Sequence, residues 1–501
     1  MAESGAVGTW ETSRGRASGC PTPGPARGRQ KRREESEDGI VLGARESRVP
    51  GEGRPRCQRF NHDASLTTEE ENDTYTGLER IAHRAQGAPQ ERFTALAHHL
   101  TEEFLCGTYA QLNRRGAPGV DRVRMATYGQ HPAAHVTDLV ARLKRGAYRA
   151  PRVRRTYIPK AGNPAKRRPL GIPTVEDRLL QAAVARVPGA IYEPVFQDSS
   201  FGFRPGRSAH DALHRVRRAV LSGRVPYAYE ADIRSFFDHL DHAWLLRMLA
   251  LKVGDPPILR LIRHWLTAGI WDQGTVTRPE AGTPQGGPLS PLRANVYLHY
   301  VLDLWFVRVV RPRLRGTADL VRYADDFLVL FEHAEDAERF ARVLPQRLAK
   351  FGLDVAPEKT RLIVFGAHAW RQGRAAAGTF DFLGFTHRLG TSRTGRMVVR
   401  RQPTPKSVQR FLRETKAWRR QHRHDAPRDQ PQTLAAKLRG VYPYFGLPLC
   451  YPALAKVRYQ VLRYGHGTLR RRSQTSRATW AWVNQRPWFH RPAPRLLHPE
   501  V

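Results

Sequence analysis

The sequence predicts an α+β fold, and its length and charge indicate the class of protein. Segments with apolar residues at helical spacing are mixed with strand-like runs, without the regular β-α alternation of a doubly wound sheet. The chain has 501 residues, enough for more than one domain. Its 83 lysine and arginine residues against 46 acidic ones give a net charge of +37, which predicts a nucleic-acid-binding protein.

The first segment, residues 1–75, is expected to be disordered. It is rich in Gly, Pro, Ser, Arg and Glu and has no sustained apolar period, so it buries too little apolar surface to offset the loss of chain entropy. Its basic patch RQKRR is interpreted either as an RNA-contacting arm or as part of a solvated tail.

The second segment, residues 76–395, carries the mixed helices and strands. Strands are predicted in YIPKAGNPAKRRPLGIPT, YAYEADIRSFF, LVRYADDFLVLF, LIVFG and FDFLGF. A glycine-rich loop, GTPQGGPLSPLRANVYLHYVLDLW, opens into a long helix. Further helices are expected in LERIAHRAQ, ERFTALAHHLTEEFLCGTYAQL, VTDLVARLKRGAYRA, EDRLLQAAVARVPGAIYEPVF, HDALHRVRRAVLSG, ILRLIRHWLTAGI and DAERFARVLPQRLAKFG.

The last two segments are residues 396–470, basic and helical in pattern, and residues 471–501, a basic, Trp/Pro-rich tail. Basic helical faces suit phosphate and shape recognition of folded RNA. The aromatic residues Trp418, Tyr442 and Tyr444 either assist that recognition or pack the domain core.

Cysteine usage and hydropathy bear on the compartment. Cys20, Cys57, Cys106 and Cys450 have no CxxC spacing, so neither a zinc knuckle nor a disulfide framework is expected. The longest apolar stretch, VYLHYVLDLWFVRVV, contains Asp303 and is too short to span a bilayer. The sequence therefore predicts a cytoplasmic protein with no membrane partner.

The stretch LVRYADDFLVLF places Asp325 and Asp326 between two apolar runs. Such runs around a short polar step predict a hairpin with the aspartates at its tip. The alternative is that Asp-Asp is only a turn dipeptide. Asp232, inside the strand-like run YAYEADIRSFF, weakens this alternative, because an aspartate is disfavoured within a strand.

Asp232 and Asp325 converge if their strands pair side by side. Two convergent carboxylates with a third beside them form a hard-oxygen site suited to Mg²⁺. Two such ions, about 4 Å apart, activate a 3′-hydroxyl and stabilise a leaving pyrophosphate. The sequence therefore predicts a two-magnesium site for nucleotidyl transfer.

With these motifs, the chain resembles the reverse transcriptase/maturase proteins encoded by bacterial group II introns. The resemblance implies a right-hand polymerase, with fingers and palm built on antiparallel sheet, followed by a helical thumb and maturase domain. Its blocks, in order, are GAPGVD, IPKAGNPAKRRPLGIPTVEDRLLQ, SSFGFRPGRSAHDAL, ADIRSFFDHLDH, GTPQGGPLSPLRANVYLH, YADD, PEKTRLIVFG, FLGF and LRGVYPYFG.

The resemblance implies roles for the acidic residues and their neighbours. Asp232 and Asp325 look like the two metal ligands, with Asp326 as the third carboxylate and the backbone of Ile233 beside them. Lys359, in PEKT, is similar to the lysine that protonates the leaving pyrophosphate; a surface lysine is the alternative.

The same resemblance implies a nucleotide pocket. Lys160 and Arg168 lie on the basic finger hairpin that would hold the dNTP triphosphate, with general RNA-backbone binding as the alternative. Gln285 would line the pocket beside glycines that allow close backbone approach. Phe237 resembles the aromatic residue that excludes a ribose 2′-hydroxyl, and Phe236 is its close competitor.

Further residues are expected to contact nucleic acid. Arg204 and Arg207, in SSFGFRPGRS, suit contacts with template phosphates. A turn that grips the primer end is implied for Phe382, Leu383 and Gly384. The RNA-binding arginines of the basic region are expected to be Arg419, Arg420, Arg470 and Arg471.

Three departures from the family pattern stand out. Ser235 occupies the position of a usual glycine, Pro288-Leu289 replaces a usual valine-isoleucine pair, and Cys450 stands alone. Because family members that cut DNA carry paired cysteines in an HNH endonuclease, no endonuclease is expected.

The implied function is RNA-directed DNA polymerase with intron maturase activity in group II intron mobility. Its partners would be structured intron RNA, an RNA template, a DNA primer or target, and dNTPs. The alternatives are a splicing-only maturase, a host-adopted reverse transcriptase in defence, and a template-independent polymerase. The sequence leaves the oligomeric state open, with a homodimer among the alternatives.

Overall fold

The computed structural model describes residues 69–160, 163–277, 281–283, 286–366, 370, 378–426, 430–472, 478–486, 489 and 492–498. All of them belong to one compact unit, Pro55–Val501. Most of the segment predicted to be disordered, residues 1–68, lies outside the described residues. Helices and antiparallel sheets are mixed in the described part, as predicted.

The N-terminal half is built mainly from helices around one large apolar core. Short 3₁₀ turns lie at Ala97–His99, Arg311–Arg313 and Pro357–Lys359. The helices between residues 69 and 349 are α1 (Glu69–Gly87), α2 (Glu102–Gln111), α3 (Met125–Tyr128), α4 (Pro132–Lys144), α5 (Val175–Tyr192), α6 (Ala209–Leu221), α7 (Phe236–His239), α8 (His242–Ala250), α9 (Pro256–Thr267), α10 (Ser290–Leu298) and α11 (Ala334–Ala349).

The first sheet, which we call the N-terminal sheet, has the strand order β2-β1-β4-β5. Its main feature is an antiparallel hairpin of β1 (Val153–Lys160) and β2 (Asn163–Ile172), the strands predicted around the Gly/Asn/Pro turn. The short strands β4 (Ile270–Asp272) and β5 (Thr275–Thr277) complete it, with β4 parallel to β1 and antiparallel to β5.

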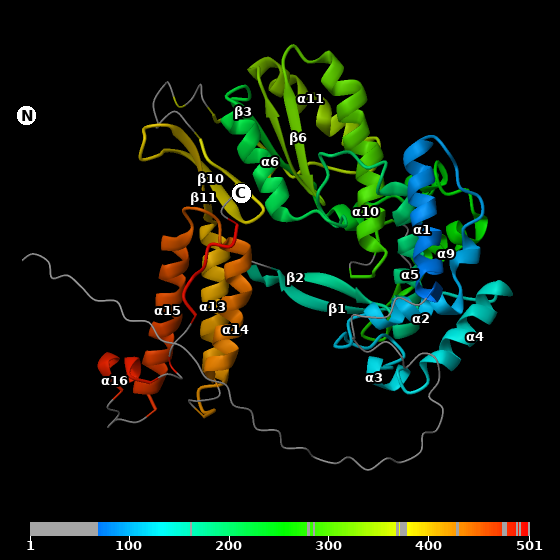
Figure 1. Ribbon diagram of the computed structural model, residues 1–501, viewed down its shortest axis with the longest axis horizontal. Coiled ribbons are helices and arrows are strands. Elements are labelled where there is room, and N and C mark those ends of the chain that lie inside the picture. The colour runs from blue at the N-terminus through cyan, green and yellow to red at the C-terminus, as the bar shows by residue number, and fades with distance from the viewer. Residues whose placement is uncertain are drawn as a thin grey trace, which may run out of the picture. The chain divides into compact units, whose positions relative to one another are not determined.

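The second sheet, the central sheet, has the order β6-β7-β3-β8 with all neighbours antiparallel. Helices cover both of its faces, with α6 on one and α11 on the other (Figure 1). Both faces of β7 are therefore buried, which explains its uninterrupted apolar run. The strands are β3 (Tyr227–Asp232), β6 (Ala318–Tyr323), β7 (Asp326–Phe331) and β8 (Arg361–Val364).

The alternation of side chains along β7 divides them between the two faces. Leu328 and Leu330 join the apolar cluster that contains residues of α6. Phe327 and Val329 join the larger cluster that contains residues of α11. This period of two is that of an extended strand.

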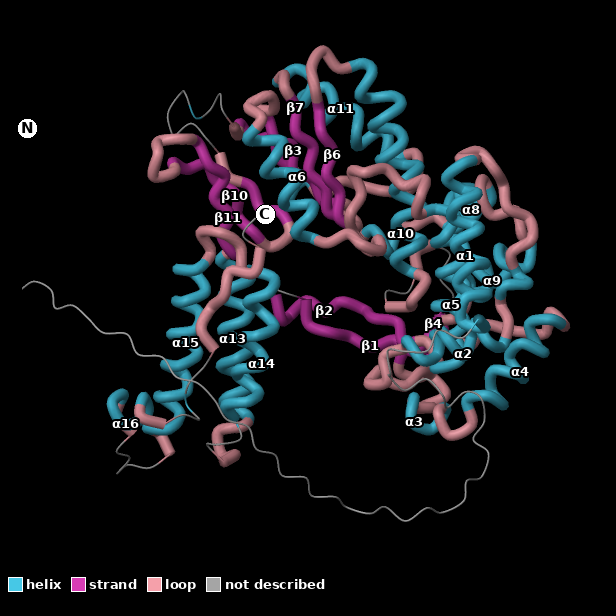
Figure 2. Tube along the Cα trace, viewed as in Figure 1, coloured by secondary structure: helices cyan, strands magenta, loops and turns pink. Residues whose placement is uncertain are grey.

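The C-terminal sheet has the order β11-β10-β9 and leads into a group of helices. Its strands are β9 (Phe380–Phe382), β10 (Phe385–Thr391) and β11 (Met397–Pro403). Because β10 pairs with β11, the predicted boundary at residues 395/396 falls inside a hairpin, and the helices begin at Pro405. Helices α13 (Pro405–Gln421), α14 (Gln430–Phe445) and α15 (Tyr451–Arg470) lie side by side around their own apolar cluster, and α16 (Trp480–Asn484) follows (Figure 2).

The turn after β3 contains Ser235, and its backbone conformation explains why glycine is usual at this position in the family. Ser235 has a φ of 43°, in the left-handed region where a side chain clashes with the backbone and glycine does not. The position thus requires a backbone conformation that favours glycine. Serine adopts the same conformation, but with an unfavourable conformational free energy. Although Ser235 precedes α7, its side chain makes no capping hydrogen bond to that helix.

We predict that Ser235→Gly raises the free energy of unfolding by about 1 kcal/mol, because glycine adopts this conformation without strain. Chemical denaturation measures the change. Ser222→Gly is the control: Ser222 has a φ of −61° and donates a hydrogen bond to the Ala219 carbonyl, so its replacement is expected to destabilise the protein. Equal effects of both changes would contradict the prediction.

Candidate active site

The carboxylates of interest meet at one end of the central sheet. Strands β6 and β7 form the predicted hairpin, with Tyr323 paired to Asp326 across the turn Ala324-Asp325. Asp232 ends β3 directly opposite Asp326. The structure therefore brings Asp232 together with the aspartate pair, and its direct partner in the strand register is Asp326.

The three carboxylates repel one another. Although the residue as a whole is exposed, the surrounding protein removes water from the carboxyl of Asp326, and this burial, together with the charges of Asp325 and Asp232, raises the pKa of Asp326 to about 7. Burial also raises the pKa of Asp325, and the charge of Asp232 adds to the rise. The site thus holds more negative charge than its surroundings neutralise.

Two basic side chains balance part of this charge. Lys359, from the turn Pro357–Lys359, donates a hydrogen bond from Nζ to the carboxylate of Asp232. Burial lowers the pKa of Lys359, but the bond to Asp232 and the acidic charges outweigh it, so the pKa is raised. The charge of Arg168, from β2, opposes the rise in the pKa of Asp325, which indicates that the β1–β2 hairpin reaches this site.

The residues next to Asp232 extend the site. Ile233 follows Asp232 and forms an isolated antiparallel bridge with Val355, while the carbonyl of Asp232 accepts a hydrogen bond from the Ala356 amide. Across the described ranges, no three His, Cys, Asp or Glu side chains are arranged as a metal site. The ammonium of Lys359 supplies the cation that Asp232 contacts here.

A buried ion pair lies directly behind the aspartate turn. Arg322, on β6, makes a two-point contact with Asp303, with Nε–Oδ1 and Nη2–Oδ2 distances of 2.8 and 2.6 Å. Both side chains are 0% exposed. Arg322 also donates to the carbonyl of Ala324 at 2.9 Å and to the hydroxyl of Ser200 at 2.7 Å. Ala324 itself has a φ of 58°, so these bonds hold a strained turn in place.

Arg322 was not among the predicted site residues, although the sequence contains a signal for it. An arginine inside an apolar strand-like run is buried only when a carboxylate accompanies it. That carboxylate, Asp303, lies in a π-helical turn that continues α10, His299–Asp303.

The segment Ser199–Phe203, part of SSFGFRPGRS, packs against the same turn. The amide of Phe201 donates to the Arg322 carbonyl at 2.9 Å, and the Arg322 amide donates to the Ser199 carbonyl at 2.8 Å. A Cβ atom on Gly202 would lie 2.4 Å from the Ala324 nitrogen. Only glycine therefore permits this approach.

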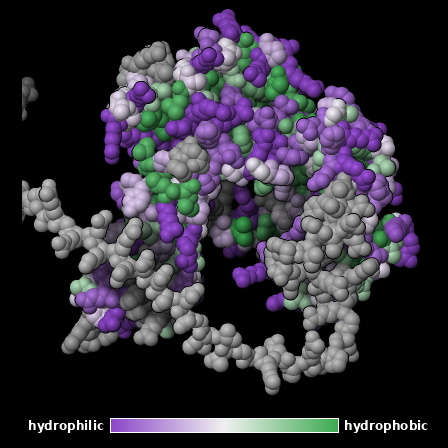
Figure 3. All heavy atoms as spheres, in the orientation of Figure 1, coloured by the Kyte–Doolittle hydropathy of each residue, from purple (hydrophilic) through white to green (hydrophobic). Residues whose placement is uncertain are grey.

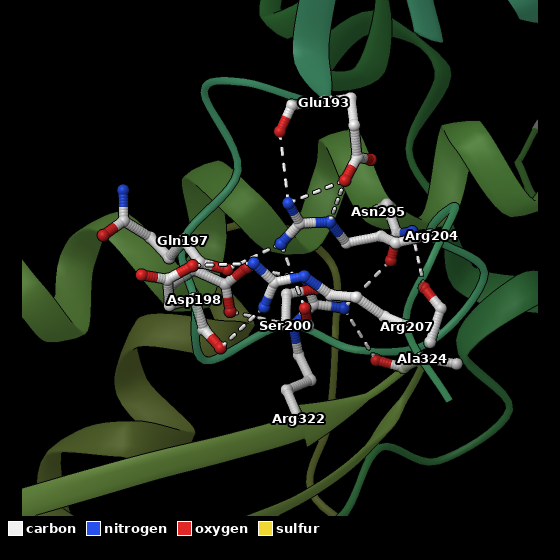
Figure 4. Close-up of polar contacts among 11 residues, drawn as sticks. Glu193, Gln197, Asp198, Ser200, Arg204, Arg207, Asn295, Arg322 and Ala324 are labelled. Atoms are coloured by element: carbon white, nitrogen blue, oxygen red, sulfur yellow. Dashed lines mark hydrogen bonds and ion pairs between the residues drawn. The ribbon is translucent and has the colours of Figure 1, made fainter. Parts of the chain in front are cut away.

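The two arginines of this segment differ in accessibility. Arg204 is buried, is paired with Glu193 at 2.8 Å and donates to the carbonyls of Gln197 and Ser200 (Figure 4). This placement argues against the predicted contact of Arg204 with a template phosphate. Arg207 is partly exposed and paired with Asp198 at 2.7 Å.

The predicted nucleotide pocket is only partly described. Phe236 is buried in the core at 2% exposure, whereas Phe237 is partly exposed, which favours Phe237 as the residue near a sugar. Arg168 is exposed, and Lys160 ends β1. Gln285 lies outside the described residues.

The predicted primer turn joins β9 to β10. Phe382 pairs with Phe385, and Leu383 and Gly384 have φ values of 50° and 76°, which is typical of a tight two-residue hairpin. Phe382 itself is buried.

The arginines predicted to bind RNA also differ in their exposure to solvent. Arg420, Arg470 and Arg471 are exposed. Arg419 is buried within the helices, 3.4 Å from the Gly465 carbonyl, so its position argues against a direct RNA contact.

Comparison with known proteins shows that one family model covers the middle of the chain, including Asp232, Asp325 and Asp326. The model described as reverse transcriptase (RNA-dependent DNA polymerase) matches residues 158–387. Group II intron-encoded protein LtrA of Lactococcus lactis subsp. cremoris is 39% identical over 232 residues, 45% of this chain and 38% of LtrA. Protein YkfC of Escherichia coli K12 is 33% identical over 283 residues, 50% of this chain and 74% of YkfC. The match thus spans well under half of the length of LtrA.

We predict that Arg322→Met lowers the free energy of unfolding by about 3–5 kcal/mol, because it leaves Asp303 buried without its cation. Chemical denaturation tests this. Arg361→Met is the control, since the contact of Arg361 with Glu230 at 2.9 Å is half exposed on the arginine side and its loss is expected to cost under about 1 kcal/mol. A similarly small loss for both variants would contradict the role of Arg322.

Proposed function

The chain belongs to the reverse transcriptase family of group II intron-encoded proteins, and we propose that it is an RNA-directed DNA polymerase with intron maturase activity that acts in group II intron mobility. The observation that carries this proposal is the meeting of Asp232 with Asp325 and Asp326 at one end of the central sheet. The negative charge of Asp232 contributes to the raised pKa of both Asp325 and Asp326, and such a concentration of carboxylates favours the binding of a divalent cation.

The proposed architecture is a right hand. The central sheet corresponds to a palm, the β1–β2 hairpin to fingers, and helices α13 to α15 to a thumb and maturase domain. This assignment is supported by the order of the elements along the chain and by the charge interaction of Arg168 with Asp325.

The acidic site suits Mg²⁺, and a contact in the structure supports this fit. The ammonium of Lys359 lies on Asp232, which places a cation against these carboxylates. Asp232, Asp325 and Asp326, with the Ile233 carbonyl, would hold two ions. When bound, Mg²⁺ lowers the pKa of a primer 3′-hydroxyl and stabilises negative charge on the leaving pyrophosphate.

The surrounding residues would bind and orient the substrates. Arg168 and Lys160 would bind the triphosphate of a dNTP. Phe237 would pack against the sugar and exclude a 2′-hydroxyl. Lys359, held protonated by the acidic groups, has a proton at Nζ to donate to the pyrophosphate.

The proposed partners are structured intron RNA, an RNA template and a DNA primer or target. The net charge of +37 and the exposed Arg420, Arg470 and Arg471 support RNA binding. Hydrophilic side chains cover much of the face shown in Figure 3. Within the described ranges, no helix is long and apolar enough to cross a bilayer. These nucleic-acid partners favour the cytoplasm as its compartment.

Primer extension on poly(rA)/oligo(dT) tests the proposal. Wild type is expected to extend the primer only with Mg²⁺ present, and Asp325→Ala is expected to lower the rate at least about a hundredfold. Asp138→Ala is the control, because Asp138 is an exposed aspartate of α4 that pairs with Arg142 on the same helix, and its loss is expected to leave the rate unchanged. Absence of synthesis by folded wild type that still binds and splices intron RNA would favour the splicing-only maturase.

A further inference from the structure

The turn Leu383-Gly384 is held by groups from the helical region that follows it. The hydroxyl of Tyr444, on α14, donates a hydrogen bond to the Leu383 carbonyl at 2.7 Å. The amide of Thr404, just before α13, donates to the Gly384 carbonyl at 2.9 Å. Leu383 has a positive φ of 50°, which is unfavourable for a residue with a side chain, so the bond to its carbonyl stabilises a conformation that the backbone alone disfavours.

Aromatic contacts fix the position of the Tyr444 ring. Its centroid lies 5.6 Å from that of Phe385, on β10, and 4.9 Å from that of Phe445. Phe445 also contacts Phe385, at 5.1 Å between centroids. The ring is thus packed between α14 and the strand that leaves the turn, which limits the directions in which its hydroxyl points.

Tyr444 also contacts the helix that follows SSFGFRPGRS. The carbonyl of Tyr444 lies 2.9 Å from Nε2 of His210, near the start of α6. The charges of Tyr323 and Asp326 contribute to the raised pKa of Tyr444, which burial brings to about 12. Tyr444 therefore remains a protonated donor at neutral pH.

We propose that Tyr444 is a positioning residue for DNA synthesis, which fixes the Leu383-Gly384 turn relative to the carboxylate site. The block LRGVYPYFG would then serve the polymerase as well as RNA recognition. The inference rests on the proposed polymerase function and assigns to the helical region a direct part in holding the primer end.

The same helix supplies a matched control. Tyr442 lies two residues before Tyr444 and donates its hydroxyl to the Pro492 carbonyl at 3.0 Å. It is buried in the apolar cluster of α14 and α15, and the partner of its hydroxyl belongs to the C-terminal segment and not to the primer turn. A change from tyrosine to phenylalanine removes one hydroxyl and one hydrogen bond to a carbonyl at either position, and it preserves the aromatic ring.

The test compares Tyr444→Phe and Tyr442→Phe with wild type in primer extension on poly(rA)/oligo(dT), with heparin added as a trap. Mean product length in a single binding event is expected to fall about threefold to tenfold for Tyr444→Phe, the effect of one lost hydrogen bond. Tyr442→Phe is expected to match wild type. Thermal unfolding of both variants checks that they fold.

Hydrogen exchange provides a second measurement that does not depend on activity. In Tyr444→Phe, amides of residues 382–386 are expected to exchange faster than in wild type or in Tyr442→Phe. Unchanged product length and unchanged exchange in Tyr444→Phe, with an active wild type, would overturn the inference. An inactive wild type would overturn the proposed polymerase function, and the role assigned to Tyr444 would fall with it.

Discussion

The buried contact of Arg322 with Asp303 is the constraint on which the candidate site depends. Both side chains are fully buried, and an isolated charge at this depth is strongly unfavourable, so each requires the other. The guanidinium group has donors left over, and it uses them to hold the carbonyl of Ala324 and the hydroxyl of Ser200. One ion pair thereby joins a helix, a strand, the aspartate turn and the segment before Arg204.

The carboxylate hairpin is held on more than one side. Gly202 approaches the backbone of Ala324 closely, the amide of Phe201 bonds the Arg322 carbonyl, and the Arg322 side chain bonds the Ala324 carbonyl. Rigid support of this kind lets acidic groups remain near one another despite their repulsion, which adds to the effect of burial in raising the pKa of Asp326. The stability of the surrounding protein offsets the unfavourable free energy of concentrating negative charge. A bound cation would neutralise part of that charge and so reduce the repulsion between the carboxylates.

Much of the fold and part of the site follow from the sequence, for physical reasons that differ between residues. The β6–β7 hairpin was predictable because two apolar, strand-like runs joined by a short polar stretch usually pair with each other. Asp232 was predictable as a site residue because aspartate is disfavoured within a strand. The burial of Arg204 and Arg419 was not predictable, since it depends on partners such as Glu193 and the Gly465 carbonyl that only the tertiary fold brings near. Neighbours Phe236 and Phe237 have the same chemistry, and only the packing of the core distinguishes them.

A structure of the protein with an RNA template, a DNA primer, an incoming dNTP and Mg²⁺ tests the central claim most directly. The account predicts magnesium between Asp232 and Asp325, with the Lys359 ammonium moved from Asp232 toward the triphosphate. It also predicts that the bond from Arg322 to the Ala324 carbonyl is retained. Metal ions bound away from these carboxylates, or a primer end far from the Leu383-Gly384 turn, would contradict it.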